Sequence, residues 1–354
     1  MITNNIYLQD IERVVSQNIE WEALAGRTML VSGAAGMIGR FLIDAIMLRN
    51  ESHMSDISVI ALGRSNNGAS RFRKYLDNKN FKYVPHDITK PYYLPEKTTV
   101  DYIIHAASNT HPLEYSTDPI GTITTNVLGT INLLNLASQS KVSRFILLSS
   151  VEVYGENLGD VEVFHEDYSG YINPNTLRAG YPESKRTAEA LCQAYAKVFN
   201  QNYVIARLAR TFGPTMHMND SKAVSQFIKN AIHNEDIVLK SKGDQLYSYT
   251  YVGDAVWGIL KLMTAGINGE AYNIAGKNSD YALRDLAYCI AGISGTKVVF
   301  ETPDPVEILG YSKAKKAILS IEKIKKLGWY PIFDVKESLK RTVEILRNCE
   351  NLCN

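Results

Sequence analysis

Cysteine is scarce in this sequence, and its few copies form no recognisable pattern. The chain of 354 residues has four: Cys192, Cys289, Cys349 and Cys353. None lies in a CxxC pair or at a metal-ligand spacing from histidine, so we expect reduced thiols, no disulfide framework and no metal site. The first residues are polar and acidic and lack the basic segment and apolar core of a secretion signal. These absences favour a cytoplasmic protein.

An excess of charge of either sign is also missing. The 38 lysine and arginine residues are nearly balanced by 37 aspartate and glutamate residues, which gives a formal net charge of +1. Without a basic stripe we expect no nucleic-acid partner, and without a long apolar run we expect no membrane partner. The length is sufficient for two domains with a large core. A small molecule is therefore the expected partner.

Short apolar runs alternate with amphipathic stretches of helical length. The runs predict buried strands at residues 27–33, 57–62, 100–105, 145–149 and 203–207. The stretches predict helices at residues 10–21, 38–48, 122–138 and 185–199. Strands that alternate with helices indicate an α/β fold, in which a doubly wound parallel sheet is covered on both faces.

A glycine-rich turn directly follows the first predicted strand. It reads Gly33-Ala-Ala-Gly36-Met37-Ile38-Gly39 and opens a helix. In a dinucleotide site the first glycine permits the tight turn, the second lets the backbone approach the pyrophosphate, and the third lets the helix pack on the strand. Free N–H groups at the helix N-terminus, at Met37 and Ile38, receive the anion. The context predicts an NAD(P) site of the Rossmann type, the alternative being a glycine turn that serves packing alone.

The end of the second predicted strand leaves the choice between NAD and NADP open. The segment Ala-Leu-Gly-Arg64-Ser has no carboxylate where an NAD site binds the ribose 2′-hydroxyl. Arg64 suits the 2′-phosphate of NADP, or it is a solvated loop arginine. Asp87 and Ile88 are expected beside the adenine, and Ala106 and Ala107 leave room for a flat cofactor.

The texture of the sequence changes after residue 212, where long helices give way to short helices, loops and isolated strands. We therefore divide the chain into three parts. Residues 1–26 are a helical extension, and residues 27–212 form the dinucleotide-binding domain. Residues 213–354 form mainly a substrate-binding lobe that is partly interleaved with the domain before it.

The sharpest catalytic signal is Tyr181-Pro-Glu-Ser-Lys185. A spacing of four residues puts the phenol and the ammonium group on one helix face, and the cation should lower the pKa of Tyr181 toward neutrality. Such a tyrosine takes a proton from a sugar hydroxyl while hydride leaves the carbon. Ser150, at the end of the strand predicted from residue 145, provides a hydroxyl that shares the hydrogen bond to the reacting oxygen.

These segments resemble the extended short-chain dehydrogenase/reductase family of NAD-dependent nucleotide-sugar epimerases, dehydratases and decarboxylases. The resemblance covers nearly the whole chain after Arg27 and rests on GAAGMIG, HAAS, LLSSVEVYG and YPESK. It implies that Ser150, Tyr181 and Lys185 form the catalytic triad and that Lys185 also holds the cofactor ribose. It further implies a tightly bound cofactor, with NAD favoured, and a homodimer that packs the YxxxK helix and its neighbour.

Within the family, the segments look most like those of UDP-glucuronate decarboxylases, above all at residues 212–220. Two positions depart from that pattern. Val151 replaces the hydroxyl next to Glu152, and Tyr247 stands where these enzymes carry an arginine. A substrate carboxylate would then lack a charge-assisted partner, so we expect chemistry on a neutral sugar, with uronate decarboxylation as the alternative. Glu152 is expected to deprotonate a carbon beside a 4-ketone, or else to bond its own loop.

Three side chains are candidates for substrate contact. Arg210 is placed to bind phosphate or to pair with a carboxylate, and Lys222 to reach a phosphate. Tyr247, in a stretch of alternating tyrosines, is placed to stack on a nucleotide base or to form a half-buried strand. The sequence thus predicts an NAD(P)-dependent enzyme of epimerase/dehydratase type that oxidises a nucleotide sugar at C4. A catalytically silent NAD(P) sensor is the rival, and the intact Ser150, Tyr181 and Lys185 argue against it.

Overall fold

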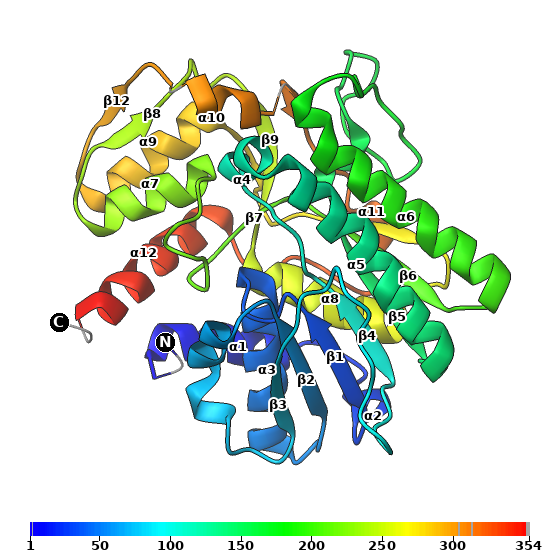
Figure 1. Cartoon of the computed structure of the whole chain (residues 1–354). Coiled ribbons are helices and arrows are strands. Elements are labelled where there is room, and N and C mark those ends of the chain that lie inside the picture. The colour runs from blue at the N-terminus through cyan, green and yellow to red at the C-terminus, as the bar shows by residue number, and fades with distance from the viewer. Residues whose placement is uncertain (2, 304, 313, 352–354) are drawn as a thin grey trace.

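The computed structural model describes residues 1, 3–303, 305–312 and 314–351. It has a large sheet between two layers of helices, with a smaller lobe beside it (Figure 1). Cys192, Cys289 and Cys349 are free thiols, whereas Cys353 lies outside the described residues. None of the helices in these ranges combines the length and the apolar character that are needed to cross a lipid bilayer.

Seven parallel strands form the large sheet, in the order β10-β6-β5-β4-β1-β2-β3. Their bounds are β1 Thr28–Ser32, β2 Ser58–Gly63, β3 Phe81–Pro85, β4 Tyr102–His105, β5 Arg144–Ser150, β6 Tyr203–Leu208 and β10 Ala271–Ile274. The order from β3 to β6 is that of a doubly wound dinucleotide-binding sheet, which confirms the predicted fold. The sequence analysis missed β3 and β10, since both are short and mix polar with apolar residues.

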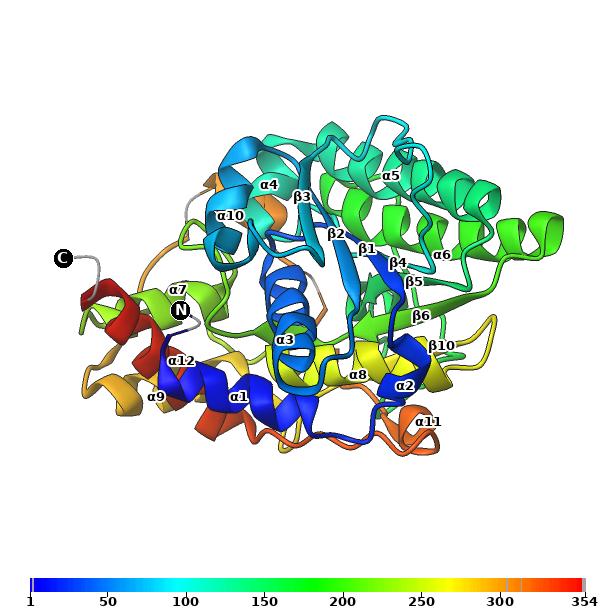
Figure 2. The same ribbon diagram turned by 90° about the horizontal axis from the view of Figure 1, so that it is seen from below.

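Helices cover both faces of this sheet (Figure 2). One layer contains α5 (Pro119–Ser140) and α6 (Gly180–Phe199), and the other contains α3 (Met37–His53) and α8 (Val252–Ala265). Along β5, Phe145 and Leu147 join the core beneath α5 and α6, whereas Ile146 and Leu148 join the core beneath α3 and α8. Burial on both faces explains why the strands appear in the sequence as continuous apolar runs.

The helix predicted over residues 10–21 is wrong in its bounds. The structure has α1 at Asn5–Val15 and a separate short helix, α2, at Trp21–Leu24. The Asn4 side chain accepts hydrogen bonds from the first free N–H groups of α1, so the helix begins earlier than its apolar pattern suggests. The indole of Trp21 donates to the carbonyl oxygen of Val15 at 3.1 Å, which fixes the bend between the two helices.

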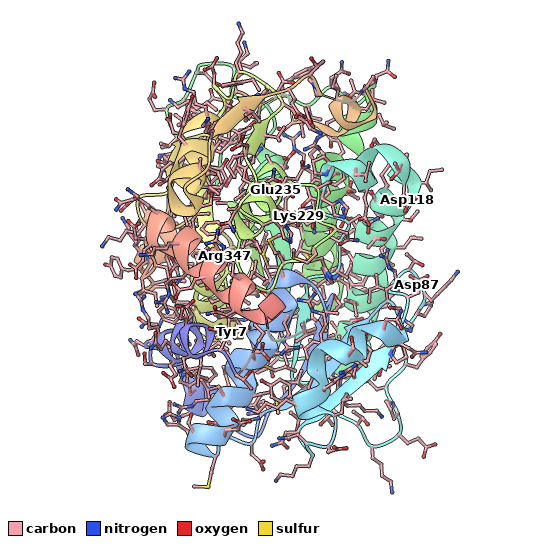
Figure 3. The ribbon with its side chains drawn as sticks, turned by 90° about the vertical axis from the view of Figure 1, so that its left-hand side faces the viewer. Tyr7, Asp87, Asp118, Lys229, Glu235 and Arg347 are labelled. Carbon is pink, nitrogen blue, oxygen red and sulfur yellow. The ribbon has the colours of Figure 1, made fainter. Side chains whose placement is uncertain are left out.

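Buried polar contacts join α1 to the rest of the molecule. The hydroxyl of Tyr7, labelled in Figure 3, donates to Asp44 of α3 at 2.7 Å. Asp10 accepts from Tyr251 at 2.6 Å and pairs with Arg341 of α12 (Val335–Asn351) at 2.6 Å. Helices α1 and α12 therefore lie side by side and contact the same part of the core.

The smaller lobe is built from short elements. Its strands are β7 Arg210–Phe212, β8 Ile237–Leu239, β9 Leu246–Tyr251, β11 Asp280–Ala282, β12 Val298–Phe300 and β13 Lys316–Ala317. Its helices are α7 Ala223–Ile232, α9 Leu283–Ser294 and α10 Pro305–Gly310. The short helix α11 (Glu322–Lys325) packs instead against β10 of the large sheet. Between these elements the chain returns to the large domain, where β10 forms an edge strand of the large sheet and α8 covers one of its faces. A short helix, α4 (Pro112–Thr117), lies between the sheet and the lobe (Figure 1).

Candidate active site

The glycine turn after β1 has the geometry that a dinucleotide requires. Gly33 has φ +65°, and a Cβ there would lie 2.6 Å from the amide nitrogen of Ala107. A Cβ on Gly39 would lie 2.5 Å from the carbonyl oxygen of Gly33. Gly36 is the N-cap of α3 and offers no side chain of its own to the first free N–H groups. The turn thus forms a cradle that side chains would fill, and it fits a pyrophosphate.

The predicted adenine-side residues occupy the ends of β2 and β3. The side chain of Tyr83 fills the space beside Gly63. A Cβ added to Gly63 would lie 2.1 Å from the hydroxyl oxygen of Tyr83. That hydroxyl donates to the carbonyl oxygen of Ser65 at 2.7 Å, so a carboxylate at position 63 is excluded without movement of Tyr83. Arg64 is exposed immediately beyond. The residues thus fit an NAD(P) cofactor without a carboxylate for its 2′-hydroxyl.

Two further predicted adenine contacts have structural partners. The carboxylate of Asp87 accepts hydrogen bonds from the backbone N–H and from the hydroxyl of Thr89. These two hydrogen bonds hold the pKa of Asp87 below its usual value. Ile88 is buried, and its carbonyl oxygen accepts from Asn132 of α5 at 3.0 Å. A role at the adenine stays a prediction for both residues.

One cavity of about 300 Å³ collects the predicted catalytic residues. Ser150, Tyr181, Lys185 and Glu152 all line it, and so do Met37, Ile38 and Ala106 from the dinucleotide turn and the end of β4, and Arg210, Lys222 and Tyr247 from the lobe. Gly33, Gly36, Gly39, Arg64, Asp87, Ile88 and Ala107 are described but do not line it. The cavity therefore joins one end of the dinucleotide turn to the lobe.

The triad has a defined hydrogen-bonding pattern. Ser150 ends β5, and its hydroxyl oxygen accepts from the N–H of Glu152 at 3.2 Å, which leaves the hydroxyl proton free to donate. The ammonium group of Lys185 donates to the carbonyl oxygen of Leu148 at 2.9 Å. Burial lowers the pKa of Lys185 to about 8, although Glu189 acts in the opposite direction. The cation is thus held at the end of β5, one helical turn beyond Tyr181.

The expectation that Lys185 lowers the pKa of Tyr181 is wrong for the protein alone. Burial and the negative charge of Glu152 raise this pKa to about 12, although Ser150, Arg178 and Tyr115 act in the opposite direction. The i, i+4 spacing was interpreted correctly as one face, because both side chains line the cavity. The sequence pattern could not show how deeply the phenol is buried.

Glu152 lies between two guanidinium groups. It pairs with Arg178 at 2.5 Å and with Arg210 at 3.7 Å. Burial raises the pKa of Glu152, but the two arginines outweigh that effect and hold the pKa below its ordinary value. Arg210 was expected either to bind a phosphate or to pair with a carboxylate, and in the structure it pairs with the carboxylate of Glu152. The carboxylate of Glu152 thus pairs with Arg178 and Arg210 rather than with its own loop, and its role in deprotonating a carbon beside a 4-ketone stays a prediction.

Tyr247 does not present its hydroxyl to the cavity. The hydroxyl donates to the carbonyl oxygen of Ala314 at 2.7 Å, and the guanidinium carbon of Arg210 lies 3.4 Å from the ring centroid. Position 247 therefore supports a cation that comes from β7. Arg178 and Arg210 both line the cavity, so the expectation that a substrate carboxylate would lack a charged partner is wrong.

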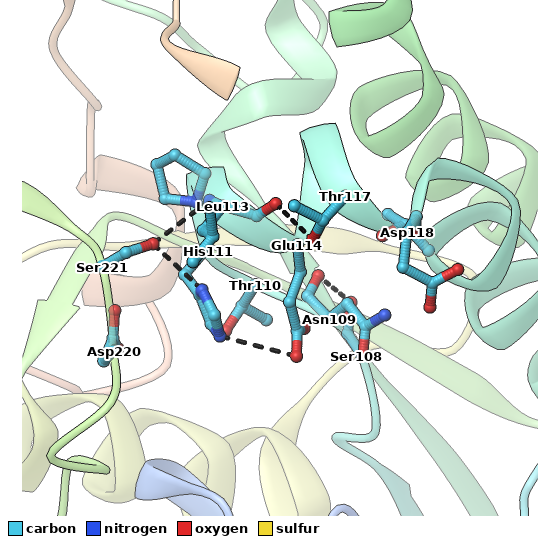
Figure 4. Close-up of polar contacts among 12 residues, drawn as sticks. Ser108, Asn109, Thr110, His111, Leu113, Glu114, Thr117, Asp118, Asp220 and Ser221 are labelled. Atoms are coloured by element: carbon cyan, nitrogen blue, oxygen red, sulfur yellow. Dashed lines mark hydrogen bonds and ion pairs between the residues drawn. The ribbon is translucent and has the colours of Figure 1, made fainter. Parts of the chain in front are cut away.

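Lys222 is tied to its own loop. Its ammonium group pairs with Asp220 at 2.5 Å, and the neighbouring Ser221 contacts α4 (Figure 4). On α4, Tyr115 lines the cavity, and its ring stacks on Tyr181. The sequence analysis missed Tyr115, because a tyrosine in a short helix after a strand carries no motif.

Comparisons with known proteins agree with this geometry. A family model described as the NAD dependent epimerase/dehydratase family matches residues 29–275. The chain is 33% identical over 325 residues to UDP-glucuronic acid decarboxylase 1 of Xenopus tropicalis, covering 91% of this chain and 72% of that protein. It is 34% identical over 330 residues to UDP-glucuronic acid decarboxylase 2 of Arabidopsis thaliana, covering 91% and 68%.

Two solved structures share the fold. A dTDP-glucose 4,6-dehydratase from Streptomyces venezuelae in complex with NAD has a TM-score of 0.79 at 24% identity, covering 92% of this chain and 98% of that one. A UDP-glucuronic acid 4-epimerase from Bacillus cereus, in complex with UDP-glucuronic acid and NAD, has a TM-score of 0.75 at 22% identity, covering 91% and 99%.

Proposed function

Since the chain belongs to the NAD dependent epimerase/dehydratase family, we propose that it is an NAD(P)-dependent enzyme of epimerase/dehydratase type that oxidises a nucleotide sugar at C4. One observation carries this proposal. Ser150, Tyr181 and Lys185 line a single cavity together with Met37 and Ile38 of the dinucleotide turn. Acid–base groups and a hydride acceptor would therefore meet at the same sugar carbon.

The residues of the chain divide the work of the oxidation. Once ionised, which Ser150, Arg178 and Tyr115 favour against burial and Glu152, Tyr181 takes the proton of the sugar 4-hydroxyl. Ser150 donates a hydrogen bond to the same oxygen. NAD(P), when bound, supplies the hydride acceptor for C4. Lys185 keeps a positive charge at the end of β5, where the cofactor ribose and the phenolate both benefit from it. The product of this step is a 4-keto sugar, whose neighbouring C–H bonds are acidified.

Glu152 is proposed to act mainly as the counter-ion of Arg178 and Arg210. A general base works best when its pKa lies near the working pH, and the two arginines hold the pKa of Glu152 below its ordinary value. Proton removal beside the 4-ketone by Glu152 stays a prediction. It requires a substrate that draws at least one arginine away from the carboxylate.

A second candidate function is decarboxylation of UDP-glucuronate, and one observation favours it. Arg178 lines the cavity, and two of its nitrogen atoms, Nε and Nη1, are buried without a hydrogen-bond partner among the described residues. Arg178 and Arg210 share a single carboxylate, that of Glu152, so the site has a net positive charge. This charge can pair with the carboxylate of a substrate. The curated relatives named above carry the same activity in their names.

Chromatographic separation followed by mass spectrometry, after incubation with UDP-, dTDP-, GDP- and CDP-sugars, tests both candidates and also resolves epimers of equal mass. Epimerase/dehydratase chemistry yields a sugar of unchanged mass or one that has lost water, whereas decarboxylation releases carbon dioxide from UDP-glucuronate. Incubation in deuterated water with Glu152→Gln as the comparison reports on proton removal beside the ketone. No change of any sugar in the panel, with cofactor bound, would contradict the proposal and support a cofactor sensor.

We also propose a homodimer that works in the cytoplasm. The helices α5 and α6 pack together on one face of the sheet, and they expose apolar side chains at Ile120, Ile123, Leu128, Val198 and Phe199. Such a surface is suited to a second copy of the same helix pair. Light scattering of the purified protein and of Ile120→Glu tests the dimer, which the variant should weaken. The free thiols support the compartment.

A further inference from the structure

A second phenol lies against the catalytic one. The ring centroids of Tyr115 and Tyr181 are 4.7 Å apart, with an angle of 27° between the ring planes. Both side chains are almost fully buried, at 7% and 6% exposure, and both line the cavity. Offset stacking of this kind fixes the plane of a ring against its neighbour. The orientation of the Tyr181 phenol is thus determined by α4 as well as by its own helix α6.

The helix that carries Tyr115 is fastened to the lobe. The hydroxyl of Ser221 contacts Nδ1 of His111 at 3.0 Å and accepts from the N–H of Leu113 at 3.1 Å (Figure 4). On its other side, Nε2 of His111 lies 3.6 Å from the carboxylate of Glu114. These contacts hold the first turn of α4, and Tyr115 is one residue beyond Glu114. The stack on Tyr181 therefore depends on a contact between α4 and the segment that leads into α7.

We propose that Tyr115 is a positioning residue for Tyr181, whose ring fixes the catalytic phenol and whose hydroxyl donates a hydrogen bond that stabilises the phenolate. The inference rests on the proposed function of Tyr181 as the base. During the oxidation the proton passes from the sugar hydroxyl to Tyr181, and Tyr115 keeps its own proton throughout.

The charges around the pair explain why such a donor is needed. Burial opposes the ionisation of both phenols, and the negative charge of Glu152 acts in the same direction. Arg178 acts in the opposite direction, and its guanidinium carbon lies 4.8 Å from the ring centroid of Tyr115. Asp220 adds a further negative contribution at Tyr115. Burial and the surrounding charges raise the pKa of Tyr115 well above its usual value, so Tyr115 keeps its proton and remains a donor.

Ionisation of Tyr181 can be measured without a substrate. Tyr181 is replaced by a difluorotyrosine, whose lower intrinsic pKa brings the titration into the range where the protein is folded, and fluorine NMR follows the ionisation in the presence of saturating NAD⁺. In the Tyr115→Phe background the apparent pKa should rise by roughly one unit, the size expected for loss of a hydrogen bond to a charged oxygen. An unchanged pKa would overturn the proposed hydrogen bond.

Two further variants separate the roles of the ring and the hydroxyl. Tyr115→Leu removes both and should also move or broaden the fluorine resonance, since the labelled ring loses its stacking partner. A change in Tyr115→Leu alone would show that Tyr115 only packs, which contradicts the proposal. Tyr7→Phe is the control, because it removes another buried, hydrogen-bonded phenol outside the cavity and should leave the titration unchanged. Absence of turnover would refute the proposed function but would not alter these titrations.

Discussion

The guanidinium group of Arg210 lies over the ring of Tyr247, with its central carbon 3.4 Å from the ring centroid. The same guanidinium is 3.7 Å from the carboxylate of Glu152. An aromatic face and a carboxylate together hold the cation in the cavity at little cost in desolvation. A tyrosine at position 247 therefore does not make the site neutral, but supports an arginine that comes from another strand.

This arrangement predicts a charge-dependent effect of Arg210. Arg210→Leu should weaken the binding of UDP-glucuronate by about tenfold or more, the size of a lost charge-assisted hydrogen bond, and that of UDP-glucose much less. Isothermal titration with both probes measures the difference. Arg284→Leu, in the lobe but outside the cavity, is the matched control. Equal losses for the two probes would mean that Arg210 does not discriminate by the charge of the sugar.

Removal of the Tyr181 hydroxyl should abolish turnover while cofactor binding persists. In Tyr181→Phe the ring still stacks on Tyr115, and only the proton-transferring group is lost. We expect a rate loss of about 10²–10⁴-fold, measured with the substrate that the sugar panel identifies. Tyr195→Phe, on the same helix but with its hydroxyl bonded to Asn135, is the control. Turnover within about tenfold of the wild type would remove Tyr181 from the mechanism.

Glu152→Gln should destabilise the protein in a pH-dependent way. The pKa of Glu152 is lower in the folded state than its ordinary value, so its stabilising contribution is present above that value and is lost as the pH falls through the folded pKa. At neutral pH the variant leaves two arginines without their carboxylate, which should cost about 3 kcal/mol in the free energy of unfolding. The difference from the wild type should shrink as the pH falls below the ordinary pKa of a glutamate and through the lower pKa of Glu152 in the folded protein.

Urea unfolding at several pH values measures this difference. Glu162→Gln is the control, since that carboxylate is exposed and pairs with Lys316 at the surface, so its loss should have little effect. A gap between wild type and Glu152→Gln that stays constant with pH would contradict the ion-pair explanation.

The end of β2 predicts that Arg64 affects the binding of NADP and of NAD differently. Since Gly63 leaves no carboxylate and Arg64 is exposed beside it, Arg64→Ala should weaken NADP binding about tenfold or more and NAD binding little. Titration of both cofactors measures the two affinities. Arg73→Ala, another exposed arginine of the following segment, should change neither. Equal losses for NAD and NADP would make Arg64 a general surface charge.

The sequence by itself determined the features that depend on residues close together along the chain. The parallel sheet, the Gly33–Gly39 turn and the shared helix face of Tyr181 and Lys185 follow from local periodicity and spacing, and the structure contains all three. Such features can be predicted because an apolar run or a fixed spacing specifies the same local geometry in most surroundings.

The tertiary structure alone decided the electrostatics of the cavity. Glu152 meets Arg178 and Arg210, which are 26 and 58 positions further along the chain by their numbering, and Tyr181 meets Tyr115 from a different helix. Whether a carboxylate is a base or a counter-ion, and whether a buried phenol has its pKa raised or lowered, depends on burial and on the charges that the fold brings together. No local pattern contains those distances, because they arise when the lobe, α4 and the end of β5 close around one cavity.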